Sequence, residues 1–60
     1  MAKYTVYFLW SDGNYSAREP LLAANDKAAF EIAADRAKGR PFELWRDGHL
    51  LASVMPKYAA

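Results

Sequence analysis

The residues that could carry out acid–base or nucleophilic chemistry are few in this chain. His49 is the only histidine, and there is no cysteine. A serine becomes a nucleophile when a base and an orienting group stand beside it. The spacing of the three serines places none of them beside His49; they are Ser11, Ser16 and Ser53. His49 follows a predicted turn, where a solvated histidine is the ordinary case. The pattern therefore favours a protein that is not an enzyme.

Acidic residues offer a second kind of chemistry, because clustered carboxylates can hold a metal ion. Asp26, Glu31 and Asp35 share part of one predicted helix surface, at spacings of five and four residues. No histidine or fourth ligand lies near them, so they are typical of a solvated helix face. Asp12 and Asp47 each precede a glycine, where aspartate supplies the hydrogen bonds of a turn. We expect no metal and no cofactor, and no residue set indicates a small-molecule ligand.

The charge balance argues against a partner that is bound by electrostatics. Eight lysines and arginines stand against seven aspartates and glutamates in 60 residues, for a net charge of +1. So small a charge predicts no strong attraction to nucleic acid or to an anionic membrane. No apolar run approaches the ~18 residues that would span a bilayer. Together with the absence of cysteine, this favours a cytoplasmic protein without a membrane segment.

Aromatic side chains are the most distinctive feature of the composition. Nine of the 60 residues are aromatic, namely two tryptophans, four tyrosines and three phenylalanines. In a chain of this length, the gain from burying apolar surface and the cost of ordering the chain each come to about 90 kcal/mol and nearly cancel. Disulfides are excluded because there is no cysteine. Association with a second copy is the remaining common means of stabilising so small a domain.

Two strands are predicted in the first third of the chain. Residues 3–10 are nearly all aromatic, β-branched or apolar, and residues 15–22 return after a Ser-Asp-Gly-Asn turn. Side chains alternate between the two faces of a strand. One face of the first strand carries Tyr4, Val6, Phe8 and Trp10, and the other carries Thr5, Tyr7 and Leu9. Pro20 has no amide hydrogen, so the second strand is predicted at an edge of the sheet.

A helix is predicted over residues 26–38, which are rich in alanine and contain no glycine or proline. Asn25 or Asp26 is the expected N-cap, and Gly39 is the expected left-handed residue after the last turn. The helix has one apolar stripe, with Phe30 beside it; the stripe comprises Ala29, Ile32, Ala33 and Ala37. Basic residues at the end of the helix are explained by the helix dipole rather than by a phosphate site; they are Arg36, Lys38 and Arg40.

The last part of the chain predicts a second hairpin, with strands at residues 42–45 and 49–54. A two-residue turn would pair Trp45 with Leu50. A three-residue turn with Gly48 in the left-handed region would instead pair Leu44 with Leu50 and Phe42 with Ala52. We favour the three-residue turn, because the apolar pattern should set the register. It groups Phe42, Leu44, Leu50, Ala52 and Val54 on one face and leaves Trp45 and Leu51 on the other.

The elements predict an α+β fold of the order β-β-α-β-β. We expect a four-stranded antiparallel sheet with one helix packed on one face, and one domain over residues 1–60. Its ordered core spans residues 3–54, and residues 55–60 form a tail that is loose unless Tyr58 docks. The order of the strands in the sheet is left open by the sequence.

Several of these residues carry a resemblance to known proteins. The opening strand Tyr4-Thr5-Val6-Tyr7-Phe8, the Asp12-Gly13 turn, the alanine-rich helix and the closing segment Phe42-Glu43-Leu44-Trp45 make up the shared pattern. In this pattern the chain resembles a group of short proteins found mainly in alphaproteobacteria. Members of that group carry a basic residue in the last strand, where this chain has His49. The resemblance implies the β-β-α-β-β fold and a bacterial source, and it implies no activity.

The face of the sheet away from the helix is the predicted functional surface. A single helix covers only one face of a four-stranded sheet, and an uncovered apolar patch is usually a contact surface. The expected contact residues are Tyr7, Leu9, Trp45 and Leu51. We expect a non-enzymatic interaction module that forms a homodimer or binds another protein.

The alternative function is the binding of single-stranded nucleic acid. Aromatic rings on an open sheet can stack on bases, and basic side chains beside them can contact phosphates. The candidate phosphate contacts are Arg18, Arg40 and Arg46. Glu19, Glu43 and Asp47 adjoin these arginines in the sequence and weaken this interpretation.

Overall fold

The structure is a computed structural model that describes residues 1–10 and 12–55. Its elements are β1 (Ala2–Leu9), β2 (Tyr15–Ala23), α1 (Asp26–Ala37), β3 (Phe42–Arg46) and β4 (His49–Val54). The order β-β-α-β-β and the α+β class are therefore confirmed. Ser11 and the tail after Met55, including Tyr58, lie outside the described residues.

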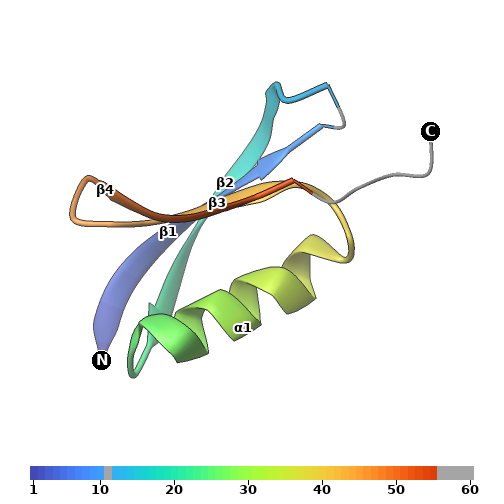
Figure 1. Ribbon diagram of the computed structural model, residues 1–60. Coiled ribbons are helices and arrows are strands. Elements are labelled where there is room, and N and C mark those ends of the chain that lie inside the picture. Colours follow the sequence, from blue (N-terminus) through green and yellow to red (C-terminus); the bar gives the residue numbers. More distant parts are fainter. Residues whose placement is uncertain (11, 56–60) are drawn as a thin grey trace.

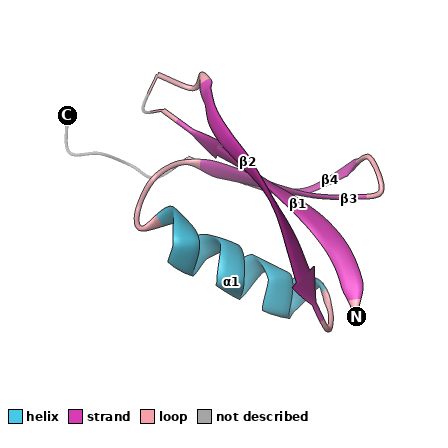
Figure 2. Cartoon of the chain, turned by 180° about the vertical axis from the view of Figure 1, so that it is seen from behind, coloured by secondary structure: helices cyan, strands magenta, loops and turns pink. Residues whose placement is uncertain are grey.

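The four strands form one antiparallel sheet in the order β2-β1-β3-β4. β1 and β3 are the central strands, although β2 and α1 separate them in the sequence (Figure 1). β2 is an edge strand, as Pro20 predicted, because a residue without an amide hydrogen is tolerated best where no further strand pairs. The helix runs below the sheet in Figure 1 and again when the chain is seen from behind in Figure 2.

The core consists of alternate strand residues together with the small residues of the helix. From the strands it takes Tyr4, Val6, Phe8, Leu21, Ala23, Phe42 and Leu44, and from the helix it takes Ala29, Ala33 and Ala37. Alanine lets the helix backbone approach the aromatic rings closely, which explains why so much of the helix is alanine. Phe30 packs its ring on Phe42, with centroids 5.7 Å apart. We call the side of the sheet that carries these strand residues the core face.

The pairing of β1 with β2 is irregular at the end of β1. The pairing with β2 shifts between Phe8 and Leu9, and the backbone N–H of Leu9 donates to the carbonyl of Pro41 at 2.9 Å. Ser16 of β2 is the extra residue of this bulge, so the two-residue period of side-chain direction is interrupted in β2. Leu9 is only 3% exposed, whereas Trp10, which follows the last residue of β1, is exposed.

Both helix ends have specific local causes. Asn25 is the N-cap, and its side-chain oxygen accepts a hydrogen bond from the backbone N–H of Ala28 at 2.8 Å. The helix ends at Ala37, one residue earlier than predicted, and Lys38 adopts the left-handed conformation with φ 51°. Gly39 follows with φ 83°, so two successive residues turn the chain towards β3.

The second hairpin closes with a two-residue turn rather than the three-residue turn that we favoured. Asp47 and Gly48 have φ values of 50° and 76°. Positive φ at both central residues is typical of a type I′ turn, whose twist matches that of the strands. Arg46 therefore pairs with His49 and Trp45 with Leu50, and the register then shifts, leaving Leu51 as the extra residue.

The bulge in β4 explains why the predicted faces are mostly right although the predicted register is wrong. Beyond Leu51, Leu44 pairs with Ala52 and Phe42 with Val54, on the core face. Leu50 is the exception, because it is opposite Trp45 and 48% exposed. The apolar pattern thus predicted the faces of Phe42, Leu44, Ala52 and Val54 but not of Leu50, and the turn chemistry decided which residues pair.

The aromatic face of the sheet

The side of the sheet opposite the core face carries a cluster of three aromatic rings. The ring of Tyr7 in β1 lies 5.4 Å from that of Tyr15 in β2 and 6.1 Å from that of Trp45 in β3, measured between centroids. The Tyr7 and Trp45 rings meet edge to face, with an interplanar angle of 76°, which is a favourable arrangement of their quadrupoles. We call this side of the sheet the aromatic face.

One carboxylate holds two of these rings in place. Glu43 Oε1 accepts hydrogen bonds from Trp45 Nε1 at 3.1 Å and from the Tyr15 hydroxyl at 3.4 Å. The negative charge of Glu43, then partial burial, then the hydrogen bond to the carboxylate, raises the pKa of the Tyr15 hydroxyl above its ordinary value. The cluster therefore has a fixed geometry: a central tyrosine, with a second tyrosine and a tryptophan tied to one anion.

The four predicted contact residues differ in their surroundings. Tyr7 and Trp45 meet on the aromatic face and are half-buried. Leu51 is the extra residue of the β4 bulge and is 39% exposed. We expected Leu9 to be an exposed contact residue. It is instead buried within the chain itself and offers almost no surface to a partner.

Tyr15 and Glu43 were missed as members of this site. Glu43 pairs with Tyr7 because β3 lies beside β1, and the sequence left that strand order open. Tyr15 reaches the cluster because the register of β1 and β2 shifts at Leu9, its cross-strand partner. The alternation of Glu43 and Trp45 in β3 was the available signal, since residues two apart in a strand share a face.

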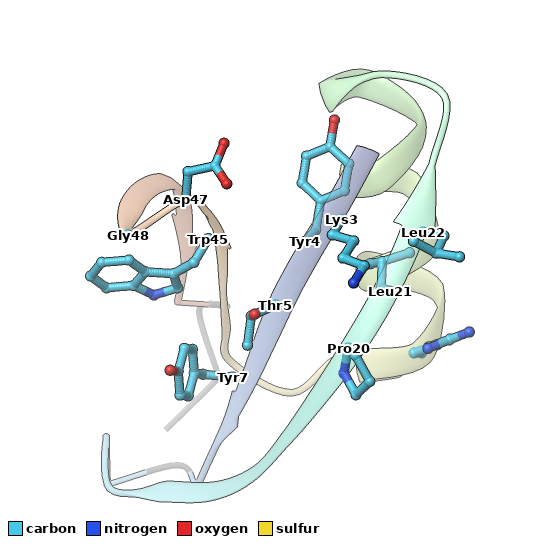
Figure 3. Close-up of a pocket in the computed structure, with 11 residues that line it drawn as sticks. Lys3, Tyr4, Thr5, Tyr7, Pro20, Leu21, Leu22, Trp45, Asp47 and Gly48 are labelled. Atoms are coloured by element: carbon cyan, nitrogen blue, oxygen red, sulfur yellow. The ribbon is translucent and has the colours of Figure 1, made fainter. Parts of the chain in front are cut away.

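An open groove of about 870 Å³ crosses the sheet beside this cluster (Figure 3). Tyr7 and Trp45 lie at one end, Thr5 lies in the middle, and Pro20 and Leu22 of β2 lie towards the other end. A 60-residue core has no spare volume for an internal pocket of ~300 Å³, but this groove lies on the surface of the twisted sheet.

A second polar cluster joins the start of the helix to the sheet. The Tyr4 hydroxyl donates to Asp26 Oδ1 at 2.8 Å, and Arg46 Nη1 donates to the same oxygen at 3.2 Å. The Arg46 guanidinium also lies over the Tyr4 ring, 5.6 Å from its centroid. Burial, followed by the hydrogen bond to Asp26, raises the pKa of the Tyr4 hydroxyl. The Tyr4 hydroxyl and the Arg46 guanidinium both already bond Asp26. This cluster therefore has a structural role, because it connects the first turn of α1 to the sheet.

The arginines proposed for phosphate contacts have separate surroundings. Arg46 is paired with Asp26, and Arg40 bonds Ser16 Oγ at 3.0 Å and lies over the Trp10 ring. Arg18 alone pairs across the sheet with Tyr7 of the aromatic face. Of the three arginines, only Arg18 therefore lies beside the aromatic rings.

Metal and membrane features can be assessed for the described residues. Within residues 1–10 and 12–55, no three histidine, cysteine, aspartate or glutamate residues are grouped so that they could hold a metal ion. Asp26, Glu31 and Asp35 accordingly form no such group. Over the same residues, no helix combines the length and the apolar character needed to cross a membrane.

No protein-family model matches this sequence, and comparison with curated proteins and with solved structures finds no significant match. The resemblance to the short alphaproteobacterial proteins stays a prediction.

Proposed function

We propose that this protein is a non-enzymatic interaction module that forms a homodimer through the aromatic face of its sheet. In this proposal α1 covers the core face only, and the second copy covers the aromatic face. The observation that carries the proposal is the cluster of Tyr7, Tyr15 and Trp45 around Glu43. Tyrosine and tryptophan bury large areas with few rotatable bonds, which makes them the common anchors of interfaces.

The fixed geometry of the rings supports this role. A side chain that is already held in place loses little freedom when a partner arrives, so less of the interaction energy is spent on ordering it. Trp45 is held by its hydrogen bond to Glu43 and by the edge of Tyr7. These rings therefore form a preorganised contact surface at the centre of the sheet.

The available surface also suits a dimer. A standard interface removes about 800 Å² from each partner, which is about a fifth of the 4313 Å² that this chain exposes. Two further leucines are exposed: Leu22 of β2, towards the other end of the groove (Figure 3), at 55%, and Leu51 of β4 at 39%. Burying them against a second copy would stabilise a chain whose own core is small. We place the dimer in the cytoplasm, as the absence of cysteine suggests.

The test is the oligomeric state of the purified chain and of its Trp45→Ala variant. Sedimentation and light scattering should give a dimer at micromolar concentration. Trp45→Ala should weaken association by at least ~1 kcal/mol, because a buried tryptophan is a frequent hot spot. Trp10→Ala is the matched control, since it removes an exposed tryptophan that takes no part in the ring cluster. It should leave the dissociation constant unchanged.

A wild-type chain that stays monomeric at millimolar concentration would overturn the proposal. An equal dissociation constant for wild type and Trp45→Ala would show that the dimer forms through another surface.

A further inference from the structure

The aromatic face carries one cation and one anion in a single row. Tyr7 pairs with Arg18 of β2 on one side and with Glu43 of β3 on the other. Side chains of paired residues in adjacent strands point to the same side of the sheet. Neighbouring strands are about 4.8 Å apart, so the backbones of Arg18 and Glu43 lie about 5 Å to either side of Tyr7.

Both charges retain bonding capacity for a partner. The other three arginines have contacts within the described residues: Arg36 with Glu19, Arg40 with Ser16 and Trp10, and Arg46 with Asp26. For Arg18, the described part of the chain provides no hydrogen bond, ion pair or ring contact. Glu43 bonds Trp45 and Tyr15 through Oε1 only, so within the same residues Oε2 accepts no hydrogen bond.

This row restricts how two copies can pack face to face. A two-fold axis parallel to β1 would exchange the two sides of the row, so β2 of one protomer would lie over β3 of its partner. A two-fold axis perpendicular to the strands would place β2 over β2 and bring the two Arg18 side chains together. Like charges in contact cost several kcal/mol at an interface, so the charge pattern favours the first arrangement.

Resting on the proposed homodimer, we propose that its two-fold axis runs parallel to β1 beside Tyr7. Arg18 of each protomer then forms an ion pair with the partner subunit's Glu43, through the oxygen that the ring cluster leaves unused. Because the interface is symmetric, this pair forms twice. The two sheets pack with their strands aligned to within about 30°, as in β-sandwiches. The paired charges set the orientation of the two copies, and the rings between them supply the buried area.

Charge exchange between two variants tests this arrangement. Homodimers of Arg18→Glu would oppose two carboxylates at each contact, and homodimers of Glu43→Arg would oppose two guanidinium groups. Each variant should raise the dissociation constant at least about ten-fold. An equimolar mixture should form a heterodimer that is tighter than either homodimer, because both of its contacts then join opposite charges.

Two further variants separate this effect from net charge and from misfolding. Lys27→Glu makes the same change of charge as Arg18→Glu on the exposed first turn of α1, and it should leave association unchanged. Glu43→Gln keeps an oxygen that can accept from Trp45 Nε1 while removing the charge. It should weaken the dimer and reduce the dependence of its dissociation constant on salt.

The outcomes distinguish this inference from the proposed function. If the wild-type chain dimerises and Arg18→Glu behaves as Lys27→Glu does, the orientation is wrong while the dimer stands. Failure of the mixed variants to associate, when each is folded by circular dichroism, also overturns it. A monomeric wild-type chain removes both proposals at once.

Discussion

At the scale of single residues, Tyr4 combines a place in the apolar core with a polar contact to the helix. Its ring belongs to the core, while its hydroxyl reaches Asp26 at the first residue of α1. Arg46 at the end of β3 reaches the same carboxylate. The pattern of alternate apolar residues predicted the buried ring correctly. The hydroxyl contact joins residues 22 positions apart and had no local signal.

The raised pKa of Tyr4 predicts a loss of stability at alkaline pH. In the unfolded chain a tyrosine ionises near its ordinary pKa of 10.0, whereas in the folded chain the Tyr4 pKa is higher. Below that ordinary value both states keep the proton. Above it the unfolded chain loses the proton first, so the free energy of unfolding falls as the pH rises through the folded pKa. In the Tyr4→Phe variant the free energy of unfolding should fall less steeply over this pH range.

Urea unfolding between about pH 8 and pH 11 measures the effect. The difference between wild type and Tyr4→Phe should be constant up to about pH 10 and should then shrink. Two curves that stay parallel across the whole range would contradict the assigned pKa direction.

The β3–β4 hairpin shows how a turn decides pairing at the scale of an element. Asp47 and Gly48 both have positive φ, and this two-residue turn sets the pairs Arg46–His49 and Trp45–Leu50. The apolar pattern of β4 then requires a bulge, with Leu51 as the extra residue. Both the turn residues and the apolar pattern can be identified in the sequence. They require different registers of β3 and β4, and a bulge that neither of them predicts reconciles the two.

Gly48 should therefore be sensitive to substitution for backbone reasons alone. A Cβ added at Gly48 would have no atom within 4 Å, but the φ of +76° is unfavourable for a residue with a side chain. Gly48→Ala should lower the free energy of unfolding by about 1 kcal/mol. Gly48→Asn should cost less, because asparagine tolerates the left-handed region. Chemical denaturation of the two variants measures both values, and equal stability of wild type and Gly48→Ala would show that another turn forms.

The whole molecule has two sheet faces with different compositions. The core face meets the alanines of α1 in one apolar cluster, while the aromatic face groups three rings with Glu43 beside an open groove. In the proposed dimer both faces are buried, the first within the chain and the second between chains. Folding and association are then linked, because a partner that binds only the folded chain stabilises it.

This linkage predicts a melting temperature that depends on protein concentration. Raising the wild-type concentration about 100-fold should raise the melting temperature measurably, since mass action favours the folded dimer. Trp45→Ala should show a smaller dependence over the same range. Calorimetry or circular dichroism at several concentrations measures the shift, and identical melting temperatures for the wild type would mean that folding does not depend on association.

The sequence alone determined the local features of this protein. The elements, an N-cap at Asn25 or Asp26, the edge position of β2 and most of the core faces of β1, β3 and β4 follow from preferences of residues close together in the chain. Only the tertiary structure decided that β3 lies beside β1, and with it that Glu43 flanks Tyr7 and bonds Tyr15, 28 positions away. Strand order is chosen by packing over the whole sheet, so no local pattern encodes it. For the same reason the burial of Leu9 and the partners of Trp45 appeared only once the sheet was assembled.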